Sequence, residues 1–442
     1  EPQCGTTLTL GASGDTVTLG SGATAAGFGS TGEISWDTTP KTADFTGVSG
    51  VGYFVNTAGG AVTVTLPGSP SAGNVIGVSD YNSTAATNAI TINRNSNKIN
   101  GDTENLSLSK ANSAIQLVYI DATTGWQSVF TGNTSDIAKT YMVATGGTIT
   151  EDGNFKVHTF TGPGTFTVSS EAECSSDNVV DYQVVAGGGA GGSNPTGFNS
   201  GGGGGAGGMR FSATTYTSPS PLKAPAALPV SVQAYPITVG GGATGAASVS
   251  KSPNGSASTF STITSAGGGS GGAQCSSSGA SGGSGGGGLA TVPSSGGPGN
   301  GNTPPVSPPQ GNNGGSGSAT TDKRQGGGGG GFNAAGTTAC NSGTTPGNGG
   351  AGLAIAITGS CVARAGGGGG GSGPSASNGT AGTGGTGGGG AGQNNNVPIG
   401  TGNGANGTSG TVNTGGGGGG TSAGGTSGSG GSGVVIIRYR FQ

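Results

Sequence analysis

A single histidine and a scatter of carboxylates are the side chains in this sequence that could support acid–base chemistry. His158 alternates with Phe155 and Phe160, and no partner for a catalytic triad is in view. Hydrolysis of a glycosidic bond needs two carboxylates in one cleft. Residues 187–442 contain one acid, Asp322, and therefore cannot supply that pair. We expect no enzyme activity.

The front part of the chain holds the remaining candidates for a carboxylate pair. They are Asp80, Asp102, Glu104 and Asp121. All four lie at the ends of short predicted strands or in the turns between them. We interpret them as solvated carboxylates rather than as a catalytic pair.

The five cysteines do not form a metal site. They are Cys4, Cys174, Cys275, Cys340 and Cys361. No CxxC pair occurs, and no histidine accompanies them at metal-ligand spacing, so no metal site is predicted. Cys340 and Cys361 are close enough in sequence to form a disulfide in an oxidising medium. Small buried thiols are the alternative.

Cofactor, nucleic-acid and membrane binding are also not expected. Glycine-rich strings match loose phosphate-loop patterns such as GxGxxG, but none ends in Gly-Lys-Ser/Thr or precedes a predicted helix, so no cofactor is predicted. Eight basic residues spread over 187–442 are too dilute for a nucleic-acid surface. The sequence contains no run of 18 apolar residues, so membrane insertion is not expected.

Composition divides the chain near residue 186. Residues 1–186 contain 24 of the 108 glycines, and residues 187–442 contain 84. The front part has 16 acids and 6 bases, while the rear part has one acid and 8 bases. We interpret this change as a domain boundary.

The front part predicts short β-strands and no significant α-helix. Residues 1–30 alternate polar and apolar side chains and predict an extended β or stalk segment. Residues 31–135 predict a small antiparallel β-sandwich or barrel. Residues 136–186 predict a bridge with a β-hairpin around Gly162-Pro163-Gly164. The candidate strands are Gly52–Asn56, Ala61–Leu66, Val75–Asp80, Ile90–Asn93, Leu106–Leu108, Ala114–Ile120, Trp126–Phe130, Lys156–Thr161, Gly164–Val168 and Val179–Ala186.

Residues 187–442 predict an ordered glycine-rich domain rather than a flexible linker. The glycine runs are separated by apolar segments, and the chain ends in a strong strand signal, Val434–Tyr439. Extended left-handed threads have three residues per turn and no internal hydrogen bonds, so their backbone groups must pair with neighbouring threads. Four loops join the predicted threads: Ser193–Ser200, Ala290–Gln325, Phe332–Gly347 and Gln393–Thr414.

Several strings resemble the glycine-rich domains of phage and bacterial surface proteins. They are VHTFTGPGTFTV (157–168), DYQVVAGGGAGG (181–192), YPITVGGGA (235–243), SASTFSTITSAGGG (256–269), NTPPVSPPQGNNGG (302–315) and GGSGVVIIRYRF (430–441). In addition, residues 34–67 resemble a β-module of marine phage fibres and virion appendages.

The resemblance implies a phage tail-fibre or other virion appendage protein, extracellular and often homotrimeric, with a distal glycine-rich domain of polyglycine-II type. Other virion proteins would bind at its N-terminal side. The loops would bind a host cell-surface glycan or outer-membrane protein. The loop residues to which this role is carried over are Phe198, Asn199, Asp322, Lys323, Arg324, Phe332, Asn394, Asn395 and Asn396.

Other functions remain open. The chain could be a purely structural neck, capsid or tail fibre, or an extracellular filament protein without receptor binding. An ice-binding protein would need a regular Thr-x-Thr ladder, which residues 187–442 lack.

Overall fold

The chain forms two compact units, residues 1–138 and 139–442. The boundary therefore lies well before the change in composition at residue 186. The computed structural model describes residues 34–131, 140–194, 199–214, 222–247, 249–291, 295–319, 324–340, 345–373, 380–393, 406–422 and 424–442. The predicted stalk, residues 1–30, lies outside these ranges.

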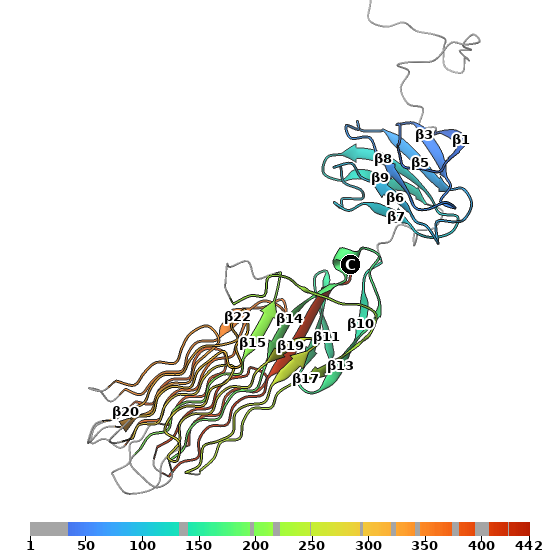
Figure 1. The fold of residues 1–442 in the computed structure, drawn as a ribbon. Helices are drawn as coiled ribbons and strands as arrows, with labels where there is room; N and C mark the ends of the chain where they lie inside the picture. Colours follow the sequence, from blue (N-terminus) through green and yellow to red (C-terminus); the bar gives the residue numbers. More distant parts are fainter. Residues whose placement is uncertain are drawn as a thin grey trace, which may run out of the picture. The chain divides into compact units, whose positions relative to one another are not determined.

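The first unit consists of two β-sheets (Figure 1). One sheet has the order β1-β3-β5-β8-β9 and the other the order β2-β4-β6-β7. The strands are β1 (Ser35–Lys41), β2 (Phe45–Thr46), β3 (Val51–Val55), β4 (Val62–Thr65), β5 (Val75–Asp80), β6 (Ile90–Asn93), β7 (Leu106–Leu108), β8 (Ala114–Asp121) and β9 (Gly125–Thr131).

The predicted antiparallel sandwich is wrong for the first half of this unit. Strands β1, β3 and β5 pair in parallel, and so do β2, β4 and β6. From β1 to β6 the chain alternates between the two sheets, so it winds like a β-solenoid. Parallel neighbours need a long crossover connection, and here a strand of the opposite sheet serves as that crossover. Antiparallel pairing begins at β7 and β8.

The core of the first unit follows from the alternation of its strands. In β4 and β6 every second residue is buried, because successive side chains of a strand point to opposite faces. The inward residues include Val64, Ile92, Leu117 and Trp126, each fully buried. Hydrophobic burial between the two sheets therefore stabilises this unit.

The second unit begins with two sheets that enclose a hydrophobic core. One has the order β10-β13-β17-β18-β19, and the other the order β11-β12-β24-β14-β15, with β16 beside β14. Two further pairs, β20-β21 and β22-β23, form two-stranded sheets. The strands of this unit are β10 (Val143–Thr145), β11 (Thr148–Asp152), β12 (Phe155–Phe160), β13 (Gly164–Ser170), β14 (Val179–Val185), β15 (Met209–Ser212), β16 (Leu228–Pro229), β17 (Ala234–Thr238), β18 (Ser258–Phe260), β19 (Ile263–Ser265), β20 (Ser318–Ala319), β21 (Arg324–Gln325), β22 (Leu353–Ile355), β23 (Val362–Arg364) and β24 (Val434–Arg440).

The last strand, β24, joins the predicted bridge to the glycine-rich part. It lies between β12 and β14 and is antiparallel to both. Its side chains alternate between two hydrophobic cores: Val435 and Ile437 face one, while Val434 and Ile436 face the other. Residues 140–186 of the predicted bridge are thus part of the glycine-rich unit, because their strands β12 and β14 pair with β24.

The predicted hairpin at Gly162-Pro163-Gly164 is also wrong. Strand β12 pairs with β11 and β24, whereas β13 pairs with β10 and β17. The turn therefore carries the chain from one sheet to the other. The two strands belong to different sheets. Alternation of polar and apolar residues on both sides of a turn is the same in this arrangement as in a hairpin, so the sequence pattern cannot distinguish the two.

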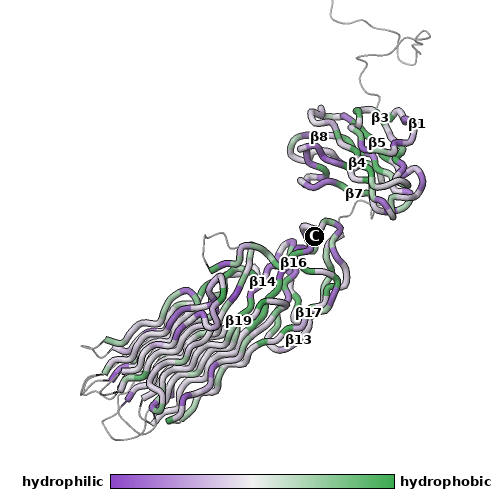
Figure 2. The backbone as a smooth tube through the Cα atoms, in the orientation of Figure 1, coloured by the Kyte–Doolittle hydropathy of each residue, from purple (hydrophilic) through white to green (hydrophobic). Residues whose placement is uncertain are grey.

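The glycine runs form extended threads that lie side by side next to the sheets (Figure 1). Gly203, Gly204 and Gly205 donate their backbone N–H groups to Gly327, Gly418 and Gly269, at 2.8–2.9 Å. Successive residues of one thread thus bind three different threads, as three residues per turn require. Figure 2 shows these threads as pale, and the hydrophobic residues gathered in the strands.

Glycine is required inside this bundle because the threads leave no space for a side chain. A Cβ atom added at Gly203 would collide with the carbonyl oxygen of Gly368, and one at Gly204 with that of Gly189. The interior runs at 201–208, 326–331 and 366–371 are buried throughout. Close backbone approach, rather than an unusual backbone angle, therefore selects glycine here.

The all-β class is confirmed. Within the described ranges the only helix is a three-residue 3-10 turn, Ser175–Asp177. No described helix is long and apolar enough to cross a membrane.

Substitution of interior and exposed glycines tests the packing of the threads. Gly204→Ala is expected to lower the free energy of unfolding by at least about 2 kcal/mol, because the added methyl forces packed backbones apart. Gly241→Ala should change it by less than about 1 kcal/mol, since Gly241 is exposed and nothing lies within 4 Å of an added Cβ. Denaturant unfolding followed by circular dichroism measures both; equal effects would contradict the packed bundle.

Protonation of His158 is expected to lower the stability of the fold in mild acid. Burial lowers the pKa of His158 below 6.5, although its hydrogen bond to Gly146 opposes the shift. Nδ1 donates to the Gly146 carbonyl oxygen at 2.7 Å, and the buried Nε2 has no acceptor for a second proton.

The unfolded chain therefore binds the proton more tightly. As the pH falls below 6.5, stability should decrease by up to about 1.4 kcal/mol per pH unit until the folded-state pKa is reached. Melting temperatures of the native chain and of His158→Phe between pH 5 and 8 measure the difference. Parallel curves would show that His158 does not cause it.

Candidate functional site

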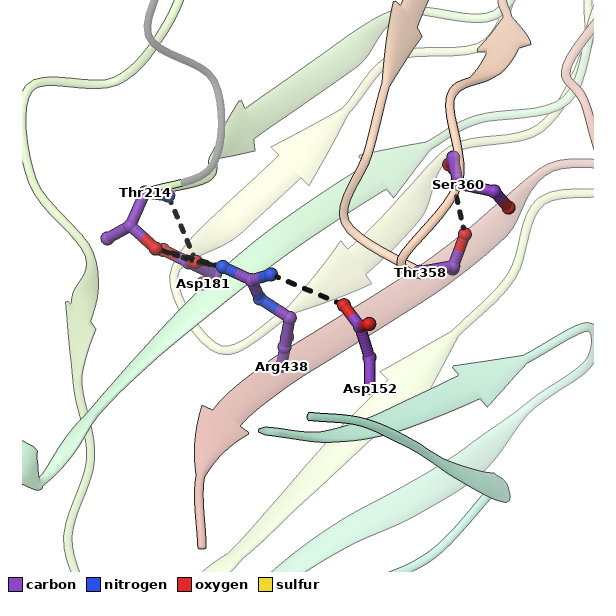
Figure 3. A network of polar contacts seen from close by, with 6 residues as sticks. All are labelled: Asp152, Asp181, Thr214, Thr358, Ser360 and Arg438. Carbon is purple, nitrogen blue, oxygen red and sulfur yellow. Dashed lines mark hydrogen bonds and ion pairs between the residues drawn. The ribbon is translucent and has the colours of Figure 1, made fainter. Parts of the chain in front are cut away.

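A buried ion pair of the second unit involves β24 (Figure 3). Arg438 Nη2 is 2.8 Å from Asp181 Oδ2 and donates to Thr214 Oγ at 2.9 Å. The same Asp181 oxygen accepts the backbone N–H and the hydroxyl of Thr214. Asp152 is more distant, at 3.9 Å from Arg438 Nη1.

The Arg438–Asp181 pair in this cluster stabilises the fold and is buried away from solvent. Only 1% of Arg438 is exposed, and its guanidinium lies over the ring of Phe155 at 4.2 Å. The turn containing Thr358 and Ser360 lies beside Asp152 in Figure 3. A buried pair is costly to break because one charge would remain uncompensated. We therefore assign the cluster to holding β24 against β14.

The carboxylates of the first unit bind backbone groups. Asp80 accepts from the N–H groups of Ala85 and Asn112, at 3.3 and 3.1 Å. Asp121 accepts from Thr123 and Thr124, at 2.8 and 2.7 Å. Asp80 is buried rather than solvated, since it fixes a loop from within. These acids stabilise turns, and nothing in their contacts brings them together.

No group of three metal-ligating side chains occurs among the described residues. Polar side chains do gather elsewhere, at the end of the glycine threads remote from the sheets, where β20 lies in Figure 1. We call this end the distal end. Six buried residues there form what we call the distal layer: Asn194, Ser200, Gln325, Ser372, Gln393 and Ser422.

Hydrogen bonds join neighbouring threads within the distal layer. The Ser200 hydroxyl donates to the Arg324 carbonyl oxygen at 2.8 Å. Gln325 and Ser372 form a backbone bridge, and Ser372 N–H donates to the Gln393 carbonyl oxygen at 3.0 Å. Ser422 N–H donates to Gln393 Oε1 at 2.9 Å. The thread ends are therefore fixed relative to one another.

Several polar atoms of the distal layer have no partner. They are both amide atoms of Gln325, Gln393 Nε2, Asn194 Oδ1 and the hydroxyls of Ser372 and Ser422. Leaving a buried polar group unsatisfied costs about 1–3 kcal/mol. Apolar side chains of the same size at these positions would therefore make the fold more stable.

Two predicted site residues meet at the distal end. Arg324 Nη1 donates to Asn199 Oδ1 at 2.7 Å, and Asn194 Nδ2 donates to the Asn199 carbonyl oxygen at 3.1 Å. The other predicted loop residues there lie outside the described residues: Phe198, Asp322, Lys323, Asn394, Asn395 and Asn396. In sequence they directly adjoin Asn199, Arg324 and Gln393.

Phe332 does not belong to this site. It is fully buried and its ring centroid lies 6.0 Å from that of Phe211, in the core beside the sheets. Phe332 follows the glycine run 326–331 at the end where that thread reaches the sheets. A large aromatic residue there fills the core, so the predicted receptor contact is wrong.

The predicted disulfide is also absent, since Cys340 and Cys361 are free, exposed thiols. Cys361 lies in the turn between β22 and β23, beside the sheets. Ala339, next to Cys340, donates its N–H to Ser316, close to β20 at the distal end. The two cysteines thus lie at opposite ends of the threads, whereas a disulfide needs Cα atoms within about 7 Å.

The distal layer itself was not predicted from the sequence. Four of its six members follow a simple rule that the sequence shows: a polar residue directly borders a glycine run. Ser200 and Gln325 precede runs, while Ser372 and Gln393 follow them. Polar residues beside glycine are also common in flexible linkers. The pattern therefore indicates a buried polar layer only once the threads are known to be ordered.

A family described as a glycine-rich domain matches residues 159–440. This range begins within β12 and ends with β24, so it includes the threads together with the strands from β13 to β24. No curated protein matches the chain.

Substitution of buried glutamines tests the distal layer. Gln325→Leu should raise the free energy of unfolding by about 1–3 kcal/mol, because it removes two unsatisfied atoms at similar volume. Gln183→Leu is the matched control: this buried amide contacts Arg364 and Met209, both at 3.1 Å, and its loss should be destabilising. Thermal unfolding separates the two; destabilisation by both would mean that Gln325 is satisfied.

Proposed function

This chain belongs to the glycine-rich domain family, and we propose that it is a structural fibre protein of a virus particle that binds a host receptor. The receptor-binding residues are those of the distal loops, including Asn199 and Arg324. The partner is a host cell-surface glycan or outer-membrane protein. The fibre is a homotrimer that other virion proteins bind at its N-terminal side, and it has no enzyme activity.

One observation carries the proposal: the distal layer fixes the thread ends from which the predicted loops leave. Segments 195–198, 320–323 and 394–405 each begin or end at a residue in or beside this layer. Residues that bind partners commonly lie on loops supported by a rigid scaffold. A bundle hydrogen-bonded in three directions is such a scaffold, and it tolerates a change of loop sequence without a change of core.

The stability cost of the distal layer supports the same interpretation. A buried polar group without a partner calls for an explanation, and a functional role is one of them. Arg324 adds a guanidinium, the side chain most suited to bidentate recognition of carboxylates and phosphates. A protein with a purely structural role would be more stable with apolar side chains in the distal layer.

Loop replacement tests the proposal. Residues 320–323 and 394–405 are replaced by Gly/Ser segments of equal length, and the fluorescently labelled full chain is added to a panel of candidate bacterial hosts. We expect binding by the native chain and loss of at least about 90% of it in the replaced chain, as for removal of central contacts. Flow cytometry measures binding, and circular dichroism checks the fold.

Alanine at three exposed positions remote from the distal end, Thr303, Pro305 and Ser307, is the control and should retain binding. Equal binding by the loop-replaced and native chains would contradict receptor binding. The chain would then be a purely structural virion fibre or an extracellular filament protein.

A further inference from the structure

Threonines gather on the outer threads of the glycine-rich unit. Four segments, 336–340, 345–350, 380–386 and 406–412, carry exposed threonines and together form what we call the threonine face. The exposed members are Thr337, Thr338, Thr345, Thr380, Thr383, Thr386, Thr408 and Thr411. The four segments contain no charged and no aromatic residue.

Backbone hydrogen bonds hold neighbouring segments of the face together. Gly349 N–H donates to the Thr383 carbonyl oxygen, and Thr337 N–H to the Asn348 carbonyl oxygen, each at 2.9 Å. Thr411 N–H donates to Gly388, in the turn that follows 380–386, at 2.8 Å. The face therefore belongs to the rigid bundle rather than to a loop.

The threonines repeat with the period of the threads. A thread with three residues per turn returns each side chain to the same side every third residue, about 9 Å along the thread. Thr380, Thr383 and Thr386 follow this spacing, and so do Thr408 and Thr411. The Thr-x-Thr pattern sought in the sequence has the period of a β-strand, so it could not detect this Thr-x-x-Thr ladder.

A purely structural role explains only some of these side chains. Thr337 Oγ accepts the N–H of Asn348 at 2.6 Å, and Asn348 Oδ1 accepts that of Thr383 at 2.9 Å. Within the described residues, the hydroxyls of Thr383 and Thr386 make no hydrogen bond. These hydroxyls are available to a partner.

The chemistry of the face selects the class of partner. A surface without charge gives no basis for binding nucleic acid or an anionic lipid. Aromatic and arginine anchors, which dominate protein–protein interfaces, are absent from the four segments. Each threonine hydroxyl both donates and accepts a hydrogen bond, as sugar hydroxyls do.

We propose that the threonine face binds a neutral polysaccharide. Hydroxyls repeat along such a chain as they do along the threads, so individually weak contacts add up over several sugar units. The rigid bundle orders these side chains before binding, which reduces the entropic cost. The face borders the distal loop 394–405 in sequence at residue 406, but its threonines lie outside that loop, and the proposal does not rest on receptor binding by the distal loops.

Retention on insoluble polysaccharides tests the proposal. The full chain is incubated with cellulose, mannan or β-1,3-glucan, and the free and bound fractions are measured. Thr383→Lys places a long charged side chain at the centre of the ladder and should weaken binding about tenfold, because several contacts are lost together. The triple variant T380A/T383A/T386A removes the hydroxyls without added bulk and should also weaken it.

Ser256→Lys is the matched control, since Ser256 is exposed on a different outer thread and should leave retention unchanged. Equal losses in Ser256→Lys and Thr383→Lys would overturn the proposal, as would failure of the native chain to bind any of the three polymers. Thermal hysteresis without retention would assign the face to ice instead. Host binding through the distal loops should be unaffected by Thr383→Lys.

Discussion

The structure of the glycine-rich unit depends on one constraint: extended threads satisfy their backbone groups only by hydrogen bonding to neighbours on several sides. Adjacent residues Gly203, Gly204 and Gly205 bind three different threads, and the backbone carbonyl groups of neighbouring threads leave no room for a Cβ. The interior must therefore be glycine, although glycine loses the most entropy on ordering. Hydrogen bonds, rather than side-chain packing, have to offset that loss across the bundle.

This constraint explains why the threads are attached to a conventional hydrophobic core. Glycine threads bury almost no apolar side-chain area, so their register must be set elsewhere. Strand β24 sets it by entering the sheet between β12 and β14 with Ile436 and Ile437 fully buried. The buried Arg438–Asp181 pair adds a specific contact in the same strand. The threads are thus fixed at the end beside the sheets by β24 and at the distal end by the distal layer.

Local patterns identified most of the strands but not their partners. Val75–Asp80, Ile90–Asn93 and Leu106–Leu108 have the bounds expected from alternation and turn residues. Parallel pairing in the first unit and the chain reversal at Gly162-Pro163-Gly164 depend on contacts between distant segments, which alternation does not encode. Phe332 was misassigned for a related reason: only the direction of each thread decides which end meets the core.

The same reasoning explains why functional residues of this chain are hard to find from sequence. In a thread with three residues per turn, side chains share a direction at every third position, whereas strand patterns have a period of two. Thr380, Thr383 and Thr386 therefore look like an irregular scatter until the thread geometry is known. Polar residues such as Gln325 likewise look like linker residues until their burial at the distal end is known. Where a fold has an unusual period, its surfaces must be interpreted with that period.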